Sequence, residues 1–393
     1  MKAYLFLALL LSAVRALSAP VLTSPTIAWS TNAHEGFLSV AFSADSARLA
    51  SGGYDPTAKV WGVTNRTLLG SFSRNQASVV AVALFPDGET LVTGGGDGAT
   101  RFWSVTTDSF LYGSPPNDGI AWSVSVAANG ANAIGLSRGK LYLNGPLGAY
   151  ALEGHGSDVY SVAFSGDSSK LASASSDGTA QIWDVPSGTT LHVFTGHSFI
   201  SLTNEEETVI RTVWGVDFSP DGSLLATIGD DGTTQLWRVS DGERLRILPS
   251  GAGYRSTVKF SADGKKLYTM ANGVIKFWRV SDGVLLNTFD GASAACLAVA
   301  IDGKHFAYGR SDGTLVVAYT PTVITSLTQK RLHTTLHWEG GSGRYQVERR
   351  RKTPNAKWHK VGLPTIATAA CVMGRPVFEY RVVSLPPKPP RRR

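Results

Sequence analysis

Residues 159–185 read VYSVAFSGDSSKLASASSDGTAQIWDV and contain three short apolar runs separated by two turns. The first run, 159–165, alternates apolar and polar residues, which is the period of a β-strand with one buried face. Turn residues follow at 166–170, and Asp177-Gly178 marks a second, tight turn. The stretch therefore predicts a helix-free β-meander, which cannot bury both faces alone and must stack on copies of itself.

Copies of this pattern recur along the chain, and the aromatic position that ends each third strand shows their spacing. That position is occupied in turn by Trp61, Trp103, Asn144, Trp183, Trp237, Trp278 and Ala318. The intervals are close to 40 residues, with one longer interval before Trp237. Seven units of this length predict a radial array of four-stranded blades. We expect the third blade to be the least regular, because Arg138-Gly139 replaces Asp-Gly there and Asn144 replaces Trp.

These repeats resemble the WD-repeat β-propeller family over residues 26–320. The resemblance implies a hydrogen-bonded set in a blade: a His before the first strand, a Ser or Thr in the second, the turn Asp and the Trp. The matching residues are His34, Ser51, Asp55 and Trp61 in the first copy, His155, Ser173, Asp177 and Trp183 in the fourth, and Thr227, Asp231 and Trp237, with His197 far upstream, in the fifth. It also implies closure of the ring by a strand swap, in which residues 26–29 pair with 315–319 and leave no open edge.

The remainder of the chain follows a different rhythm of alternating strands and Gly- or Pro-containing turns. Residues 322–385 resemble a fibronectin type III-like module in three pairs of core residues, Leu336 and Trp338, Tyr345 and Val347, Tyr380 and Val382. The predicted fold class is all-β. A seven-bladed β-propeller at 20–321 is followed by a small β-sandwich-like domain at 322–385 and a basic Pro/Arg tail at 386–393.

The beginning of the chain predicts a cleaved signal peptide at residues 1–19. Lys2 supplies a positive start, residues 5–14 form an apolar core, and small residues suit cleavage after Ser18. Arg15 ends the apolar run well short of a membrane span. The expected location is therefore outside the cytoplasm, secreted or periplasmic.

The net charge of +7 is unevenly placed along the sequence. Residues 322–393 hold 15 Lys and Arg against 3 Asp and Glu, whereas residues 1–321 hold 22 against 27. An acidic disc joined to a basic segment is expected, and Arg349-Arg350-Arg351 and residues 391–393 concentrate the positive charge. This segment is suited either to contact an anionic envelope polymer or to form a solvated surface. Nucleic acid is a less expected partner for an exported chain.

The sequence predicts no catalytic, cofactor-binding or metal-binding constellation. Residues 94–98, GGGDG, lack the Lys-Ser/Thr ending of a phosphate loop. Cys296 and Cys371 are the only cysteines, and two buried thiols are favoured over a disulfide. Two function classes stay open: a non-enzymatic interaction protein, or a propeller enzyme (hydrolase, lyase or quinone-dependent oxidoreductase) with a site at the axial channel. Polar side chains from three or more blades meeting at the axis would favour the enzyme.

A binding patch for a protein or glycan partner is predicted from the alignment of the repeats. Trp122, Tyr160 and Trp214 occupy the same position near the start of the first strand in three successive blades, while Asp158 and Tyr254 lie two residues earlier. The extra segment 198–212 is expected beside them. Large aromatic rings with a polar rim bury much area at little entropic cost. The alternative is that these rings fill gaps between blades.

Overall fold

A computed structural model describes residues 25–116, 119–145, 148–197 and 212–320, and the strand backbone at 21–22, 199–201, 207–209, 323–330, 333–339, 344–351, 359–365, 369–373 and 378–385. The signal at 1–19 and the tail at 386–393 lie outside these residues. The chain divides into two compact units, of which one is Ile27–Ala318 and the other combines segments from both ends of the chain. Apart from one 3₁₀ turn at Ser137–Gly139, the described secondary structure is β-strand.

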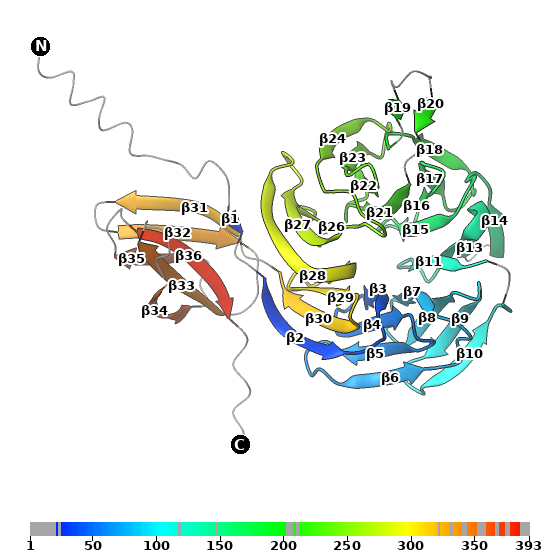
Figure 1. Ribbon diagram of the computed structural model, residues 1–393, viewed down its shortest axis with the longest axis horizontal. Coiled ribbons are helices and arrows are strands. Elements are labelled where there is room, and N and C mark those ends of the chain that lie inside the picture. The colour runs from blue at the N-terminus through cyan, green and yellow to red at the C-terminus, as the bar shows by residue number, and fades with distance from the viewer. Residues whose placement is uncertain are drawn as a thin grey trace, which may run out of the picture. The chain divides into compact units, whose positions relative to one another are not determined.

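The larger unit is a seven-bladed propeller, as predicted (Figure 1). Each of the first four blades is an antiparallel sheet of four strands in chain order. Blade one contains β3 (Phe37–Phe42), β4 (Arg48–Gly53), β5 (Ala58–Gly62) and β6 (Leu68–Phe72), and blade two contains β7 (Val79–Leu84), β8 (Thr90–Gly95), β9 (Thr100–Ser104) and β10 (Ser109–Gly113). Blade three contains β11 (Ala121–Val126), β12 (Asn132–Leu136), β13 (Leu141–Gly145) and β14 (Gly148–Leu152). Blade four contains β15 (Val159–Phe164), β16 (Lys170–Ser175), β17 (Ala180–Asp184) and β18 (Thr190–Phe194).

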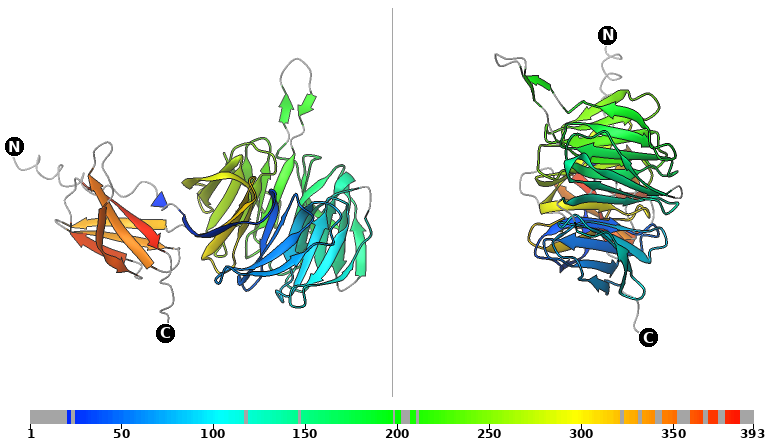
Figure 2. Two further views of the ribbon diagram at one scale, coloured as in Figure 1. Left: turned by 60° about the horizontal axis from the view of Figure 1, so that its bottom comes forward. Right: turned by 90° about the vertical axis from the view of Figure 1, so that its right-hand side faces the viewer.

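A small hairpin precedes blade five, where the sequence has its extra segment. It pairs β19 (Phe199–Ser201) with β20 (Glu207–Val209) and projects from the propeller (Figure 2). Blade five follows with four strands in chain order, β21 (Val213–Phe218), β22 (Leu224–Gly229), β23 (Thr234–Arg238) and β24 (Arg244–Leu248).

Blades six and seven share one long strand, which the sequence did not predict. Their strands are β25 (Thr257–Phe260), β26 (Lys266–Ala271), β27 (Gly273–Arg279), β28 (Leu285–Val299), β29 (His305–Arg310), β30 (Thr314–Tyr319) and β2 (Thr26–Asn32). The first part of β28 pairs with β27 and its last part with β29, so it is the outer strand of blade six and the inner strand of blade seven. Ala292 and Ser293 have positive φ between these two parts and redirect the chain.

The tight turns are set by Asp and Gly, as the turn before β17 shows. Gly178 has φ +85°, a left-handed conformation that L side chains rarely adopt. The Asp177 carboxylate accepts a hydrogen bond from the Thr179 backbone N–H at 2.8 Å, which fixes the turn locally. This chemistry explains why the Asp-Gly pairs in the sequence marked the blade boundaries.

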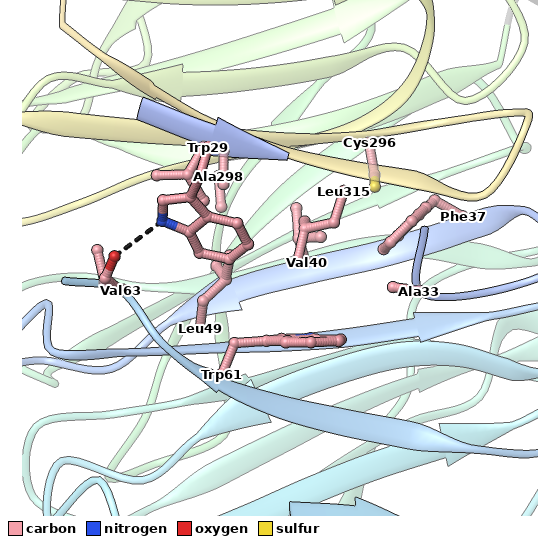
Figure 3. Close-up of a cluster of buried hydrophobic side chains, with 12 residues drawn as sticks. Trp29, Ala33, Phe37, Val40, Leu49, Trp61, Val63, Cys296, Ala298 and Leu315 are labelled. Carbon is pink, nitrogen blue, oxygen red and sulfur yellow. Dashed lines mark hydrogen bonds between the residues drawn. The ribbon is translucent and has the colours of Figure 1, made fainter. Parts of the chain in front are cut away.

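The ring closes through β2, which pairs with β30 and so completes blade seven with a strand from the beginning of the chain. Trp29 of β2 is buried among Leu49, Trp61 and Val317, and its Nε1–H donates to the Val63 carbonyl at 2.8 Å (Figure 3). The predicted strand swap is confirmed. It covers the edge of β30 that blade seven would otherwise expose.

Blade three departs from the common pattern at the predicted positions. Arg138 and Gly139 both have positive φ, at 61° and 73°, in the 3₁₀ turn that replaces the Asp-Gly turn. Asn144 Nδ2 donates to Asn132 Oδ1 at 3.0 Å, where blades one, two, four, five and six join a Trp to a Ser or Thr. A shorter amide pair therefore takes over the contact, and the sheet keeps its four strands.

The second unit contains two antiparallel sheets. One has the order β1 (Val21–Leu22), β31 (Val323–Lys330), β32 (His333–Glu339) and β35 (Ala369–Met373). The other has the order β34 (His359–Thr365), β33 (Arg344–Arg351) and β36 (Phe378–Leu385). Our boundary at residue 20 assigned Val21–Leu22 to the propeller, whereas the strand covers the free edge of β31. The likeness to a fibronectin type III-like module stays a prediction.

Candidate functional site: an aromatic row at the end of the channel

Three blades contain the hydrogen-bonded set that the resemblance implied. In blade four, His155 Nδ1 lies 2.8 Å from Asp177 Oδ2 and its Nε2 lies 2.7 Å from Ser173 Oγ. The same Oγ accepts a hydrogen bond from Trp183 Nε1 at 2.8 Å. Blades one and five repeat the set at 2.7–3.0 Å with His34, Asp55, Ser51 and Trp61, and with His197, Asp231, Thr227 and Trp237. Each set ties a turn to the core of its blade, so these polar residues are explained by the architecture.

Blade two builds the same contact with a residue that the sequence reasoning missed. Thr93 Oγ1 donates to Asn75 Oδ1 at 3.2 Å and accepts from Trp103 Nε1 at 3.1 Å. Asn75 precedes Thr93 by 18 residues, which is the interval between His155 and Ser173. The spacing of 18 residues could have identified Asn75, but the expected pattern allowed only His at that position.

Four aromatic rings from blades three to six form a continuous row at the start of the inner strands. The Tyr160 ring centroid lies 5.0 Å from that of Trp122, edge-on, and 4.5 Å from that of Trp214, stacked. The Trp214 centroid lies 4.8 Å from that of Tyr254. Tyr254 is 66% exposed and the other three rings are half-buried. We call these four residues the aromatic row; it bridges neighbouring blades and also presents surface to solvent.

The row ends where the equivalent positions carry smaller side chains. Val80 in blade two and Ser256 in blade six are buried, and Ala295 in blade seven is half-buried. The Ser256 hydroxyl donates to the Gly253 carbonyl at 2.7 Å and so serves its own loop. The aromatic surface is therefore confined to one side of the ring.

Asp158 forms the polar partner of the row, at the place the repeat alignment gave it. Its carboxylate accepts hydrogen bonds from Trp122 Nε1 at 3.1 Å and from the Arg138 backbone N–H at 2.8 Å. Burial raises the pKa of the Tyr160 hydroxyl, and the neighbouring Asp158 charge raises it further. Tyr160 is thus neutral and Asp158 holds the Trp122 indole in place. The structure brings together all five residues that the sequence singled out.

Arg255 is a member of the site that the sequence reasoning missed. Its guanidinium carbon lies 5.5 Å from the ring centroid of Trp122 and 5.7 Å from that of Tyr254, which is cation–π distance. The residue has φ +58°, a left-handed backbone that turns its side chain over the row. The sequence shows that Arg255 follows Tyr254 directly, but it does not show the backbone conformation of the folded loop, which decides where the Arg255 side chain lies.

The inner strands of all seven blades line a central channel of about 680 Å³. Its wall consists mainly of Ser, Ala, Val and Phe side chains, and its charged groups among the described residues are Asp217 and Lys259. Lys259 Nζ lies 2.9 Å from Asp217 Oδ1, and Asp217 Oδ2 accepts from the Phe260 backbone N–H at 2.8 Å. The two charges come from neighbouring blades five and six and neutralise one another.

Cys296 lies at the wall of the channel as a free, buried thiol. Burial raises its pKa to about 12, so the thiol is neutral and unreactive in the folded protein. The side chain of Cys371, on β35, lies outside the described residues. Among the residues that the structure describes, no cluster of three His, Cys, Asp or Glu could hold a metal ion. The described part of the chain also contains no helix long and apolar enough to cross a membrane.

Comparison with protein families places this architecture. A family model described as "WD domain, G-beta repeat" matches residues 26–62, 66–104, 149–184 and 188–238. These segments of the propeller are WD repeats. Each matched segment combines the outer strand of one blade with the first three strands of the next, so the matches cover the first three strands of blades one, two, four and five. The first three strands of blade three, where the Trp and the Asp-Gly turn are missing, lie outside them, as do those of blades six and seven.

Curated relatives share the repeats over part of their length. SEC12-like protein 1 of Arabidopsis thaliana is 30% identical over 186 residues, 44% of this chain and 42% of that protein. Apoptotic protease-activating factor 1 of Rattus norvegicus is 34% identical over 144 residues, 34% of this chain and 10% of that protein. A guanine nucleotide-binding protein subunit beta of Solanum tuberosum is 30% identical over 179 residues, 42% of this chain and 44% of that protein. The chain spans less than half the length of each. WD-repeat propellers act as scaffolds for protein interactions and generally do so without catalysis.

Proposed function

We propose that this protein is an exported, non-enzymatic scaffold that captures a protein partner on the aromatic row, Trp122, Tyr160, Trp214 and Tyr254. The carrying observation is that four rings from four successive blades contact one another in series and still leave surface open to solvent. Aromatic side chains with few rotatable bonds are the residues that dominate binding energy at interfaces.

Export and anchoring belong to the same proposal. The apolar core and small residues of the segment 1–19 support cleavage and secretion or periplasmic delivery. N-terminal sequencing of exported protein should begin close to residue 19 or 20, and a retained residue 1 would contradict cleavage of the signal. Residues 322–393 contain 15 basic and 3 acidic residues, and this positive charge supports contact with an anionic envelope polymer.

The test of the binding face is the double substitution Trp122→Ala with Trp214→Ala in the mature protein. A matched control removes two aromatic rings elsewhere, Phe110→Ala with Tyr112→Ala on the outer strand of blade two, where both are exposed. We expect the first pair to abolish capture of partners from the exporting cell while the fold persists, and the control pair to leave capture unchanged.

Thermal melting separates binding from packing in this experiment. If the row pair melts far below the wild-type protein and capture falls only in step with unfolding, the rings are interior packing and the proposal fails. If captured material is released by free sugars rather than by competing protein, the partner is a glycan and the protein assignment fails.

A further inference from the structure

A small pocket lies at the aromatic row, where the row meets the channel. It encloses about 120 Å³ and is lined by Trp122, Tyr160, Trp214, Arg255 and Lys259 among others. The described lining contains two basic residues and no Asp or Glu. Lys259 is already paired with Asp217. The charge that the fold leaves available at this pocket is therefore the Arg255 guanidinium.

Arg255 is held over the row by rings rather than by an acid. It stacks near Trp122 and Tyr254, and no carboxylate of the described residues forms an ion pair with it. Asp158, the acidic residue of the site, accepts hydrogen bonds from Trp122 Nε1 and from the Arg138 backbone N–H. A guanidinium presents a planar fork of donors that matches the two oxygens of a carboxylate.

Trp214 supplies a second donor without an acceptor. Its Nε1–H is buried, and the described residues offer it no hydrogen-bond partner. Leaving a buried donor unsatisfied costs about 1–3 kcal/mol, so an acceptor that enters from outside removes a penalty that the free protein carries. Buried, unpaired polar atoms are rare enough in folded proteins to need an explanation.

We propose that this pocket receives the carboxylate of an Asp or Glu side chain on a protein partner, with Arg255 and Trp214 Nε1–H as donors. The inference rests on the proposed function and specifies the partner's chemistry. A pocket of about 120 Å³ has room for a small polar group such as the carboxylate of an Asp side chain. A cationic ligand would meet Arg255 as a like charge, which disfavours it.

The experiment observes the indole N–H resonances of the mature protein by two-dimensional ¹⁵N NMR in 0.15 M salt. The Trp214 resonance is assigned by its loss in Trp214→Phe. The probe is the blocked peptide acetyl-Gly-Gly-Asp-Gly-Gly-amide, and its comparison is the same peptide with Asn. We expect a saturable shift of the Trp214 resonance with the Asp peptide and at least about tenfold weaker binding of the Asn peptide, as for a lost charge-assisted hydrogen bond.

Two variants locate the effect. Arg255→Gln should weaken binding of the Asp peptide by at least about tenfold. Arg74→Gln removes another arginine stacked on an aromatic ring and should leave this affinity unchanged. Trp214→Phe should weaken binding, followed by the Trp122 indole resonance, because Phe has no donor in place of the Nε1–H, which bonds nothing in the free protein.

Several results would overturn the inference. One is the absence of a saturable shift with the Asp peptide up to tens of millimolar, and another is equal binding of the Asp and Asn peptides. The others are undiminished binding of the Asp peptide by the Arg255→Gln protein, and tighter binding of inorganic phosphate than of the Asp peptide. The proposed function fails separately. If Arg255→Gln captures the partner normally while Trp122→Ala with Trp214→Ala does not, the face stands and the carboxylate assignment is wrong.

Discussion

Substitution of Trp183 by Ala tests the packing between blades three and four. The side chain is 1% exposed and packs with Leu141, Leu143 and Leu152 of blade three. It therefore fills the space between two sheets, each of which is fixed by its own antiparallel ladder. Neither sheet can move far to refill that space, so the substitution leaves a cavity.

The expected cost follows from these contacts. Truncation of a buried Phe or Trp to Ala costs about 3–5 kcal/mol. The lost hydrogen bond adds little, because Ser173 Oγ keeps His155 Nε2 at 2.7 Å and one such bond is worth about 1 kcal/mol. With about 2–4 °C per kcal/mol for a domain of some 150–250 residues, the melting temperature should fall by about 6–20 °C. Trp183→Phe, which keeps much of the ring, should cost about 1–2 kcal/mol.

Calorimetry or circular dichroism on the mature protein gives the measurement, and Tyr54→Ala is the control. Tyr54 is also aromatic but is 62% exposed, so its loss should stay within about 0.5 kcal/mol. A Trp183→Ala protein that melts no lower than Tyr54→Ala would refute the inter-blade packing argument. A Trp183→Phe protein as unstable as Trp183→Ala would assign the effect to the hydrogen bond instead.

Two further outcomes are expected, one for acid stability and one for the basic segment. Burial raises the pKa of Asp177, but hydrogen bonds from His155 and Thr179 outweigh it and hold the pKa below its usual value. Ionised Asp177 thus stabilises the fold above the unfolded pKa of about 3.9 and loses this effect as the pH falls below it. The Asp177→Asn protein should be less stable than the wild type at pH 7 and should lose less stability on acidification. Stability-versus-pH curves of the two proteins that run parallel would contradict this. Replacing Arg349, Arg350 and Arg351 by Gln should reduce retention on cell envelopes at low salt, because charge attraction is screened over about 8 Å at physiological ionic strength. The control replaces Arg66, Arg74 and Arg246 by Gln. If both triple variants are retained equally, the charges at 349–351 do not cause the retention.

The number of blades, the strand swap and the positions of the aromatic row followed from the sequence. A radial repeat makes this possible, because residues in equivalent positions of successive repeats must lie side by side around the ring. Trp122, Tyr160 and Trp214 could therefore be predicted as neighbours although dozens of residues separate them. The blade sets around His34, His155 and His197 were found in the same way, through fixed spacing.

Tertiary structure alone decided the features that depend on a particular backbone conformation or on pairing between distant segments. Arg255 lies over the row because its φ is positive, and no side-chain pattern encodes that angle. Val21–Leu22 pairs with β31, some 300 residues away, because that edge needs hydrogen-bond partners. The unpaired Nε1–H of Trp214 is likewise visible only when every neighbour is in place. Local periodicity fixes the repeating unit, whereas the polar atoms left unsatisfied are known only once the ring has closed.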